Sequence, residues 1–427
     1  MTEQFDPHNA DPDDYAPLST PEADPWTIDI EAIDMAYGPL FQAGVHHEYF
    51  KRLRRDDPVH YYEGNPFTGP YWSVTRYKDV MAVDTNHEDF SSEPSIVLID
   101  QIMPDQVVPN FISLDPPTHD IQRKAVTPAV KPLRLAELDG LIRERTEEVL
   151  DGLPIGEPFN WVDKVSIELT TRMLATLFDF PFEDRRKLTF WSDVSTTPPV
   201  QMGMTADERV AHLIECLQTF MKLFKERQHE GNESQDFISL LANNPDTRDM
   251  DEMTLLGNLL LLIVGGNDTT RNSMSGGVWF CHENPGEFAK VKANPELIPS
   301  MVSEIIRYQT PLSYMRRTAK RDVEIGGKLI KKGEKVAMWY ASANRDPDEI
   351  DRPDEFIIDR ENARHHIAFG FGIHRCMGNR VAEAQLRILW EEILKRFDRI
   401  EVIGKPERLA HSFVHGIKDM QVVVHPR

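Results

Sequence analysis

The segment 369–378 places one cysteine, Cys376, among three glycines, directly before a strongly helical stretch at 379–397. Glycine allows positive φ and a close approach of the backbone. A thiolate in such a loop would accept N–H groups from the loop and from the helix N-terminus, and these lower its pKa. A cysteine that only fills a core needs none of this. The pattern therefore predicts that Cys376 serves as a metal ligand or as a nucleophile.

The composition of the chain indicates its cellular compartment and excludes some classes of ligand. The chain has 427 residues and only two further cysteines, Cys216 and Cys281, which excludes a disulfide framework and favours a reducing cytoplasm. Its 48 basic and 70 acidic side chains leave a net charge of −22, which opposes binding to nucleic acid. The N-terminus lacks a signal sequence, and the longest apolar run, 255–266, is too short for a bilayer core of about 30 Å. We therefore expect a cytoplasmic protein with no membrane span.

Hydrophobic spacing predicts the fold class. Apolar residues recur at helical spacing in most of the chain after about residue 119, whereas strand patterns are few and partly C-terminal. A further helix should begin at Tyr77. The expected helices cover 138–150, 165–177, 206–228, 237–241, 253–281 and 379–397, and the expected strands cover 59–62, 71–74, 323–330, 335–339 and 421–424. The prediction is a mostly α protein with minor β structure.

No internal repeat and no linker divides the chain, which favours a single large domain over residues 41–427, expected to be a monomer. Residues 1–40 form an acidic, proline-rich N-terminal extension that we expect to be partly disordered, above all in about its first 25 residues. The loop at 92–117 carries five prolines and many Ile and Val residues. Long loops of this kind are usually functional.

Several chemistries compete for the Cys376 thiolate. Zinc would need further Cys or His ligands at short spacing, and no such pair accompanies the segment. A cysteine hydrolase would need a paired base, but His374 is only two residues away on a turn and is poorly placed to activate the sulfur. A dinucleotide fingerprint fails because Arg375 stands where its third glycine belongs. Haem iron remains, with one axial thiolate and an open sixth position.

The segment Phe-x-x-Gly-x-His-Arg-Cys-x-Gly at 369–378 resembles the haem-binding signature of the cytochrome P450 superfamily. Further motifs extend the resemblance over roughly residues 40–427. It implies the cytochrome P450 fold, a haem b cofactor with Cys376 as the iron ligand, and O2 as co-substrate. Phe369, Gly370, His374 and Gly378 belong to the same expected cofactor site.

Within the apolar helix expected at 253–281, the sequence Gly-Gly-Asn-Asp-Thr-Thr at 265–270 resembles the family's oxygen-activation motif. Gly265 would leave room beside the haem and belongs to the expected cofactor site. Asp268 and Thr269 would be the catalytic residues that supply protons and hydrogen bonds. Without the cysteine signature, the same two residues would more simply cap a helix break or bond to the preceding turn.

Glu304 and Arg307 match the family's Glu-x-x-Arg, which implies a structural role in holding the segment that carries the thiolate. As a surface pair they would contribute only about 0.2–0.5 kcal/mol. The family's usual third member is an arginine, and Glu355 stands at that place here. Arg352 and Arg360 are the candidates for the missing partner.

Haem carries two propionates and therefore needs cations or imidazoles at its rim. The pattern around His119 and Arg123 resembles the family's Asp-Pro-Pro-x-His-x-x-x-Arg, and Arg317 and His374 match two further propionate partners. Each alone could be a solvated surface residue. The agreement of all four positions favours haem binding.

The haem thiolate implies insertion of one oxygen atom into a C–H bond. Three stretches, 177–188, 261–277 and 374–380, resemble the soluble bacterial alkane hydroxylase family, whose members oxidise terminal methyl groups. The implied reaction is terminal (omega) hydroxylation of medium-chain alkanes, fatty acids or related alkyl compounds. The alternatives are a subterminal or terpene-type hydroxylase, a peroxide-driven fatty-acid hydroxylase and a non-catalytic haem-thiolate sensor. The expected pocket for a small apolar substrate consists of Ile99, Val107, Val108, Phe111, Leu262, Gly265, Leu312, Met315, Phe413 and Val414.

The sequence shows no flavin or nicotinamide fold, so electrons must come from a separate partner. The resemblance implies an iron–sulfur ferredoxin of the 2Fe–2S type and an NAD(P)H-dependent ferredoxin reductase. Arg123, Lys124, Arg375 and Arg380 would form a local basic patch for an acidic ferredoxin.

Overall fold

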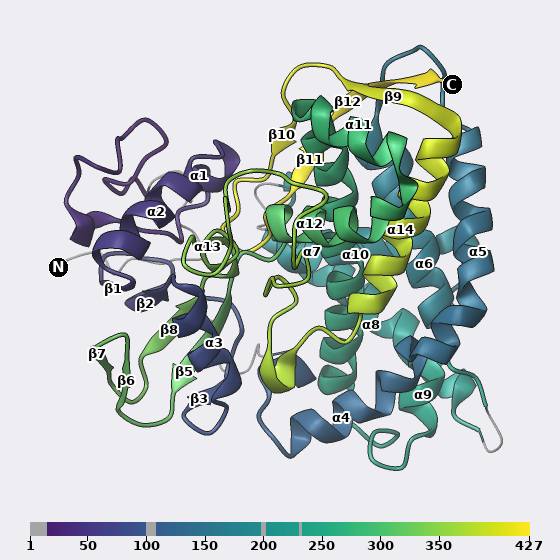
Figure 1. The fold of residues 1–427 in the computed structure, drawn as a ribbon. Coiled ribbons are helices and arrows are strands. Elements are labelled where there is room, and N and C mark those ends of the chain that lie inside the picture. The colour runs from purple at the N-terminus through teal and green to yellow at the C-terminus, as the bar shows by residue number, and fades with distance from the viewer. Residues whose placement is uncertain (1–14, 100–107, 198–201, 230–232) are drawn as a thin grey trace.

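The computed structural model describes residues 15–99, 108–197, 202–229 and 233–427 (Figure 1). Helices dominate these ranges, which confirms the mostly α prediction. A mass of helices forms one side of the molecule, and a five-stranded sheet with α1–α3 forms the other (Figure 1). The helices are α1 (Pro39–Gln42), α2 (His46–Asp56), α3 (Tyr77–Thr85), α4 (Thr118–Val126), α5 (Pro132–Asp151), α6 (Glu168–Phe178), α7 (Arg186–Thr196), α8 (Ala206–Arg227), α9 (Phe237–Asn243), α10 (Glu252–Glu283), α11 (Pro285–Ala293), α12 (Ile298–Gln309), α13 (Tyr340–Ala343) and α14 (Asn379–Arg396).

The strands form four small sheets. The largest has the order β1-β2-β8-β5-β3, in which β2 and β8 run parallel and the other neighbours antiparallel. Its strands are β1 (Val59–Tyr62), β2 (Tyr71–Val74), β3 (Phe90–Ser91), β5 (Met315–Ala319) and β8 (Lys335–Met338). The other sheets join β4 (Phe159–Asn160), β12 (Gln421–Pro426) and β9 (Phe397–Val402), then β6 (Val323–Ile325) with β7 (Lys328–Ile330), and β10 (Glu407–Arg408) with β11 (Ile417–Asp419).

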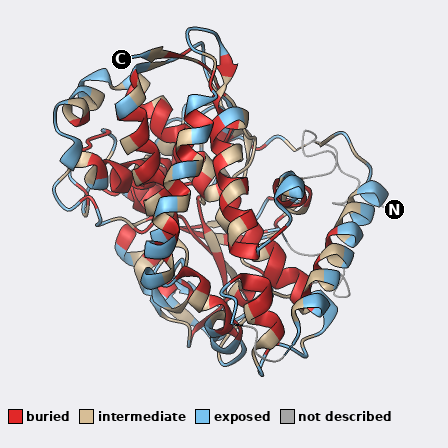
Figure 2. Ribbon diagram, turned by 90° about the vertical axis from the view of Figure 1, so that its right-hand side faces the viewer, coloured by how far each residue is buried: buried red, intermediate tan, exposed pale blue. Residues whose placement is uncertain are grey.

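Helix α10 runs through the centre of the helical mass. Its sequence is apolar on most of its faces, which is typical of a helix surrounded by others, and most of its residues are buried (Figure 2). Asp251 caps its start, because one carboxylate oxygen accepts the N–H groups of Met253 (3.1 Å) and Thr254 (2.9 Å). In the described part of the chain, no helix is long and apolar enough to cross a membrane.

Most of the expected elements are confirmed, but the single strand expected at 323–330 is a hairpin of β6 and β7, because Gly326 and Gly327 turn the chain with positive φ. β1 and β2 form the predicted hairpin, with Val59 opposite Val74, and α3 begins at Tyr77. The helix expected at 379–397 ends one residue earlier, because Phe397 begins β9. Strand β5 was not predicted, since its sequence Met-Arg-Arg-Thr-Ala lacks alternating apolar residues. It lies between β8 and β3 in the sheet, and its two arginines are buried.

The described part of the expected N-terminal extension, residues 15–40, packs against the domain. The hydroxyl of Tyr15 lies 2.6 Å from that of Tyr62, and Ser19 is fully buried. The Asp34 carboxylate accepts hydrogen bonds from Tyr71 Oη and Asn65 Nδ2, both at 2.6 Å. Part of residues 15–25 therefore contacts the domain, although the segment is rich in acids and prolines. Residues 1–14 lie outside the described ranges.

Buried imidazoles join α2 to the C-terminal segment. The rings of His46 and His415 lie 4.9 Å apart, and the remaining close charges are Arg408 and Arg345. Burial lowers the pKa of His46 far below its ordinary value and lowers that of His415 to about 3. His415 Nδ1 lies 2.8 Å from the carbonyl oxygen of Gln309, so the neutral ring donates a hydrogen bond there. The packing holds these imidazoles in the uncharged form.

This burial predicts acid sensitivity with a defined sign. In the unfolded chain His415 binds a proton near its ordinary pKa of about 6.5, whereas in the folded protein it does so only near pH 3. Between these values the unfolded state binds more protons, so the free energy of unfolding falls by about 1.4 kcal/mol per pH unit for this residue as the pH is lowered. In urea titrations at several pH values, His415→Gln should flatten that dependence. A slope equal to that of the wild type, or to that of the surface variant His425→Gln, would contradict the prediction.

Candidate functional site

Cys376 lies in a tight loop between Ile367 and α14. Its N–H donates to the carbonyl oxygen of Phe369 at 2.8 Å. Gly370 and Gly372 both have φ of +66°, a region that favours glycine. A Cβ on Gly372 would lie 2.5 Å from the carbonyl oxygen of Asp84 at the end of α3, so only glycine fits there. The glycines noted in the sequence thus let the loop press against α3.

The surroundings of the Cys376 thiol correct one expectation. The N–H groups of Gly378 and Asn379 do lower its pKa, as predicted, and the charges of Arg123 and Arg375 lower it further, but burial outweighs them and the net pKa is raised. The residue is nevertheless exposed. A bound metal cation would supply the charge that deprotonates this thiol.

A second exposed residue lies in the middle of helix α10, where most residues are buried. Gly265 is exposed, and a Cβ added there would meet no atom within 4 Å. Thr269, one turn further on, donates its hydroxyl hydrogen to the Gly265 carbonyl oxygen at 2.8 Å. This is the bond to the preceding turn that the sequence left open as an alternative. The glycine therefore leaves free space beside the Thr269 side chain.

Asp268 faces different surroundings from Thr269. It is buried, and its carboxylate pairs with Arg271 at 3.0 Å and accepts hydrogen bonds from Asn267 (2.9 Å) and from Ser192 of α7 (3.4 Å). Arg271 also pairs with Asp193 of α7 at 2.9 Å. Burial raises the pKa of Asp268, and Arg271 opposes that effect. The structure thus places the two expected catalytic residues next to each other in the chain but in separate environments.

The imidazoles expected at the haem rim do come together. The rings of His119 and His374 lie 4.2 Å apart, and both residues are buried. His374 Nε2 lies 2.9 Å from the Ser92 hydroxyl, and His119 Nδ1 lies 2.7 Å from Asp120. The remaining nitrogens, His119 Nε2 and His374 Nδ1, have no hydrogen-bond partner among the residues that the structure describes. Two buried, unpartnered ring nitrogens side by side suit an acceptor group such as a carboxylate.

The two expected arginines lie close to this pair. The charges of Arg317 and Arg123, together with burial, lower the pKa of His374 to about 2. Arg123 donates to the carbonyl oxygen of Arg375, next to the cysteine. Arg317 is buried and pairs with Asp84 at 3.0 Å, a partner that the sequence did not reveal. All four predicted rim residues therefore gather around the same region.

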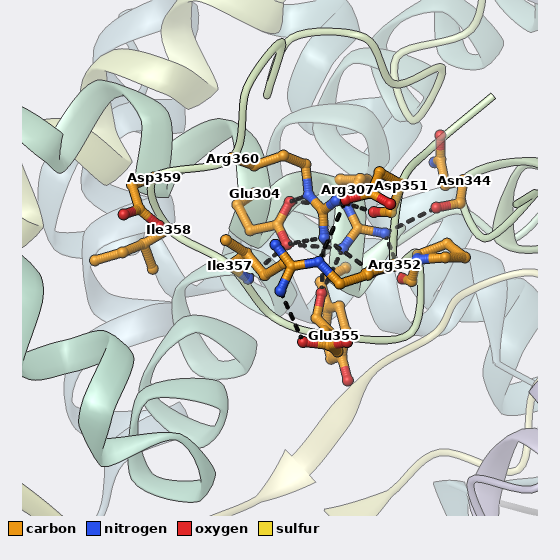
Figure 3. A network of polar contacts seen from close by, with 12 residues as sticks. Glu304, Arg307, Asn344, Asp351, Arg352, Glu355, Ile357, Ile358, Asp359 and Arg360 are labelled. Atoms are coloured by element: carbon orange, nitrogen blue, oxygen red, sulfur yellow. Dashed lines mark hydrogen bonds and ion pairs between the residues drawn. The ribbon is translucent and has the colours of Figure 1, made fainter.

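The Glu304 carboxylate is fully buried and resolves the question of the third partner (Figure 3). It accepts two hydrogen bonds from Arg307, both at 2.7 Å, and two from Arg360, at 3.0 and 3.2 Å. The N–H of Ile357 adds a fifth at 2.8 Å. Arg352 instead pairs at the surface with Asp351 and Glu355. Arg360 is therefore the missing member.

This network reaches the cysteine loop through Asn344. Arg307 Nη1 donates to the Asn344 carbonyl oxygen at 2.9 Å. The Asn344 side chain in turn accepts the N–H of Ile367 at 2.8 Å, at the start of the loop. No motif pointed to Asn344, because its two bonds join it to residues 37 and 23 positions away. The Glu-x-x-Arg pair thus supports the loop by hydrogen bonds through one amide.

The expected pocket residues fall into two apolar groups. Phe111, Leu262 and, at the edge, Val108 pack in one cluster with α6 and α7. Leu312, Met315, Phe413 and Val414 pack in another with the five-stranded sheet. Ile99 is 54% exposed, and Val107 lies outside the described residues. The structure therefore does not place Ile99 in a buried apolar wall.

Among the described residues, no three His, Cys, Asp or Glu side chains are grouped to hold a metal ion. Cys376 would be the sole protein ligand, which suits a metal whose other ligands come from a cofactor. The exposed sulfur, the open face of Gly265 and the unpartnered histidine nitrogens fit a haem with its carboxylates.

The sequence matches the family model described as Cytochrome P450 over residues 37–422. The chain belongs to the cytochrome P450 family. The structure of CYP153D17 from Sphingomonas sp. PAMC 26605 is 46% identical, with a TM-score of 0.87, and the match covers 93% of this P450 and all of that chain. Linalool 8-monooxygenase of Pseudomonas putida is 34% identical over 411 residues, 93% of this chain and 100% of the relative. Methyl-branched lipid omega-hydroxylase of Mycobacterium bovis (strain ATCC BAA-935 / AF2122/97) is 28% identical over 388 residues, 87% of this chain and 90% of the relative.

Family membership confirms the superfamily resemblance, the fold and the cofactor. This P450 is a monooxygenase that uses haem b and O2.

The Glu304 network predicts different roles for two nearby arginines. Arg360→Ala leaves a buried carboxylate without one of its two cations, so the free energy of unfolding should fall by about 3 kcal/mol or more. Arg352→Ala removes only surface ion pairs and should change it by less than about 1 kcal/mol. Urea unfolding of both haem-loaded variants measures the difference. Equal losses would show that Arg360 is not the partner that matters.

Proposed function

We propose that this P450 inserts one oxygen atom of O2 into a terminal C–H bond of medium-chain alkanes, fatty acids or related alkyl compounds. Cys376 would be the haem ligand, and His119, Arg123, Arg317 and His374 would hold the propionates. When bound through a thiolate, haem supplies the electron-rich iron that favours O–O cleavage. The observation that carries the proposal is the exposure of Cys376 together with that of Gly265, which lies in the middle of a helix whose central residues are mostly buried.

In this proposal Asp268 and Thr269 supply protons and hydrogen bonds. The Thr269 hydroxyl lies on the open face of α10, where it can turn from the Gly265 carbonyl toward a bound molecule. Asp268 is the buried acid beside it, and its carboxylate pairs with Arg271. A sensor that only binds a gas has no need of an acid and an alcohol at this place, which favours catalysis.

Thr269→Ala should separate electron use from product formation. Loss of the hydroxyl removes a proton donor, so the yield of hydroxylated product per NADH oxidised should fall by about tenfold or more and hydrogen peroxide should appear instead. Ser273→Ala is the matched control, because Ser273 lies one turn further along α10 and bonds to the Thr269 carbonyl oxygen. Unchanged coupling in the Thr269 variant would remove this residue from the mechanism.

The two apolar groups of expected pocket residues, one around Phe111 and Leu262 and the other around Leu312 and Phe413, support this substrate class. Burial of each methylene of an alkyl chain contributes about 0.8 kcal/mol, and both groups consist of apolar side chains. The omega-hydroxylase relative is named for attack at a chain end. The linalool 8-monooxygenase relative keeps a terpene-type substrate as the second candidate.

Electrons would come from a 2Fe–2S ferredoxin and an NAD(P)H-dependent reductase. Lys124, Arg375 and Arg380 are exposed around the cysteine loop, and Arg123 bonds to the Arg375 carbonyl oxygen among them. This grouping gives a basic surface on an acidic chain, suited to an acidic partner.

A titration of the haem spin state with alkanes, fatty acids and linalool of matched concentration tests the substrate class. We expect affinity to rise with alkyl chain length by roughly a factor of four per methylene until the pocket is full. Product analysis after turnover with ferredoxin and reductase should then locate the hydroxyl at the terminal carbon. Tighter binding of linalool than of any linear compound, or subterminal products, would favour the terpene-type alternative.

A further inference from the structure

Asp84 is a buried carboxylate at a place where neither helix formation nor burial favours it. It occupies the last turn of α3, where the helix dipole opposes a negative charge. It is 4% exposed, and burial raises its pKa even though Arg317 opposes that effect. A carboxylate kept at such a site must be held by specific partners.

Those partners come from three separate parts of the chain. Asp84 Oδ1 pairs with Arg317 Nη2 of β5 at 3.0 Å. Oδ2 accepts the hydroxyl hydrogen of Tyr340 in α13 at 2.9 Å and the N–H of Phe371 in the cysteine loop at 2.8 Å. One side chain therefore connects an expected propionate partner with the loop that carries Cys376.

The backbone of α3 fits the same loop closely. A Cβ on Gly372 would lie 2.5 Å from the Asp84 carbonyl oxygen, and a Cβ on Gly370 would lie 3.3 Å from Tyr340 Oη and 3.5 Å from Asp84 Oδ2. The glycines thus bring the loop within reach of the carboxylate. The loop therefore packs closely against α3 in addition to its hydrogen bond with Asp84.

We propose that Asp84 is a positioning residue for the haem site, which fixes the loop of Cys376 through Phe371 and holds the Arg317 side chain in place at the same time. The proposal rests on Cys376 being the haem ligand. A carboxylate that orients groups around a metal ligand affects metal affinity and potential without touching the metal.

The charge of Arg317 gives the expected direction of the effect on potential. Arg317 is buried and pairs with Asp84 at 3.0 Å, and Asp84 in turn bonds to the loop of Cys376, so this charge lies close to the expected haem site. Asp84→Asn leaves that positive charge uncompensated. A positive charge near the haem favours the reduced state, so the midpoint potential should move to a more positive value.

The experiment compares the haem-loaded wild type with Asp84→Asn. In the variant, haem transfer to an apoprotein acceptor should accelerate by about tenfold or more. The thiolate band of the reduced carbon monoxide complex should lose intensity to an inactive form, and the midpoint potential should rise. These three measurements report on the haem site rather than on turnover.

Asp34→Asn is the matched control. Asp34 is also a fully buried carboxylate with a tyrosine hydroxyl (Tyr71), a side-chain amide (Asn65) and a backbone N–H (Ala36) as donors, but it belongs to the packing of the N-terminal segment. It should lower the unfolding temperature without changing haem release, the thiolate band or the potential. If both variants change all three measurements alike, Asp84 is merely structural and the proposal is overturned.

Further variants make every outcome decisive. Tyr340→Phe removes one donor to Oδ2 and keeps the ring, so it should shift the same measurements in the same directions by less, even if the Asp84 variant fails to accumulate. No shift in Tyr340→Phe and none in Asp84→Asn would overturn the proposal. Cys376→Ser should abolish the thiolate band, whereas Cys216→Ser and Cys281→Ser should keep it. A band that survives in Cys376→Ser would refute the proposed ligand itself, a failure separate from that of Asp84.

Discussion

The buried charge of Glu304 is the interaction on which the shape of the cysteine loop depends. A carboxylate with no contact to water is stable only when cations and N–H groups surround it, and here two arginines and one backbone amide do so. Arg307 also donates a hydrogen bond to the carbonyl oxygen of Asn344. The Asn344 side chain in turn accepts the N–H of the first residue of the loop. The loop is therefore set by directional polar bonds, which specify position more sharply than apolar packing does.

The same loop is held from its other side by Asp84. Asn344 fixes the N–H of Ile367, and Asp84 fixes that of Phe371, so two side chains from distant elements hold the two ends of a five-residue stretch of backbone. The hydrogen bond from the Cys376 N–H to the Phe369 carbonyl oxygen links the cysteine, and with it the sulfur, to this fixed stretch of backbone. Gly370 and Gly372 are the residues that make it possible, because their positive φ values turn the chain between these anchors. A loop held in this way keeps its ligand in one orientation without the help of further metal-binding side chains.

The sequence allowed most local features of the site to be predicted, because they are encoded at short spacing. The hairpin of β1 and β2, the helix after Cys376 and the pair of Glu304 and Arg307 are of this kind. Asp84 and Ser92 could not be found, since their partners Phe371 and His374 lie more than 280 residues away and no pattern links them. The sign of the Cys376 pKa shift also depended on burial, which only the tertiary structure shows. Arg360 was a candidate beside Arg352, and geometry decided between them.

The contact between α7 and α10 determines both the surroundings of Asp268 and the apolar packing of these helices. Adjacent residues on a helix point about 100° apart, so Thr269 can face open space while Asp268 faces α7. The acid is held there by Ser192 directly and by Asp193 through Arg271. Any shift of α7 relative to α10 must therefore change the bonds of Asp268. Leu188 and Trp191 of α7 pack in the same apolar cluster as Phe111 and Leu262, which were predicted to line the substrate pocket. The helix that restrains Asp268 thus also packs in the apolar cluster, so both depend on the position of α7.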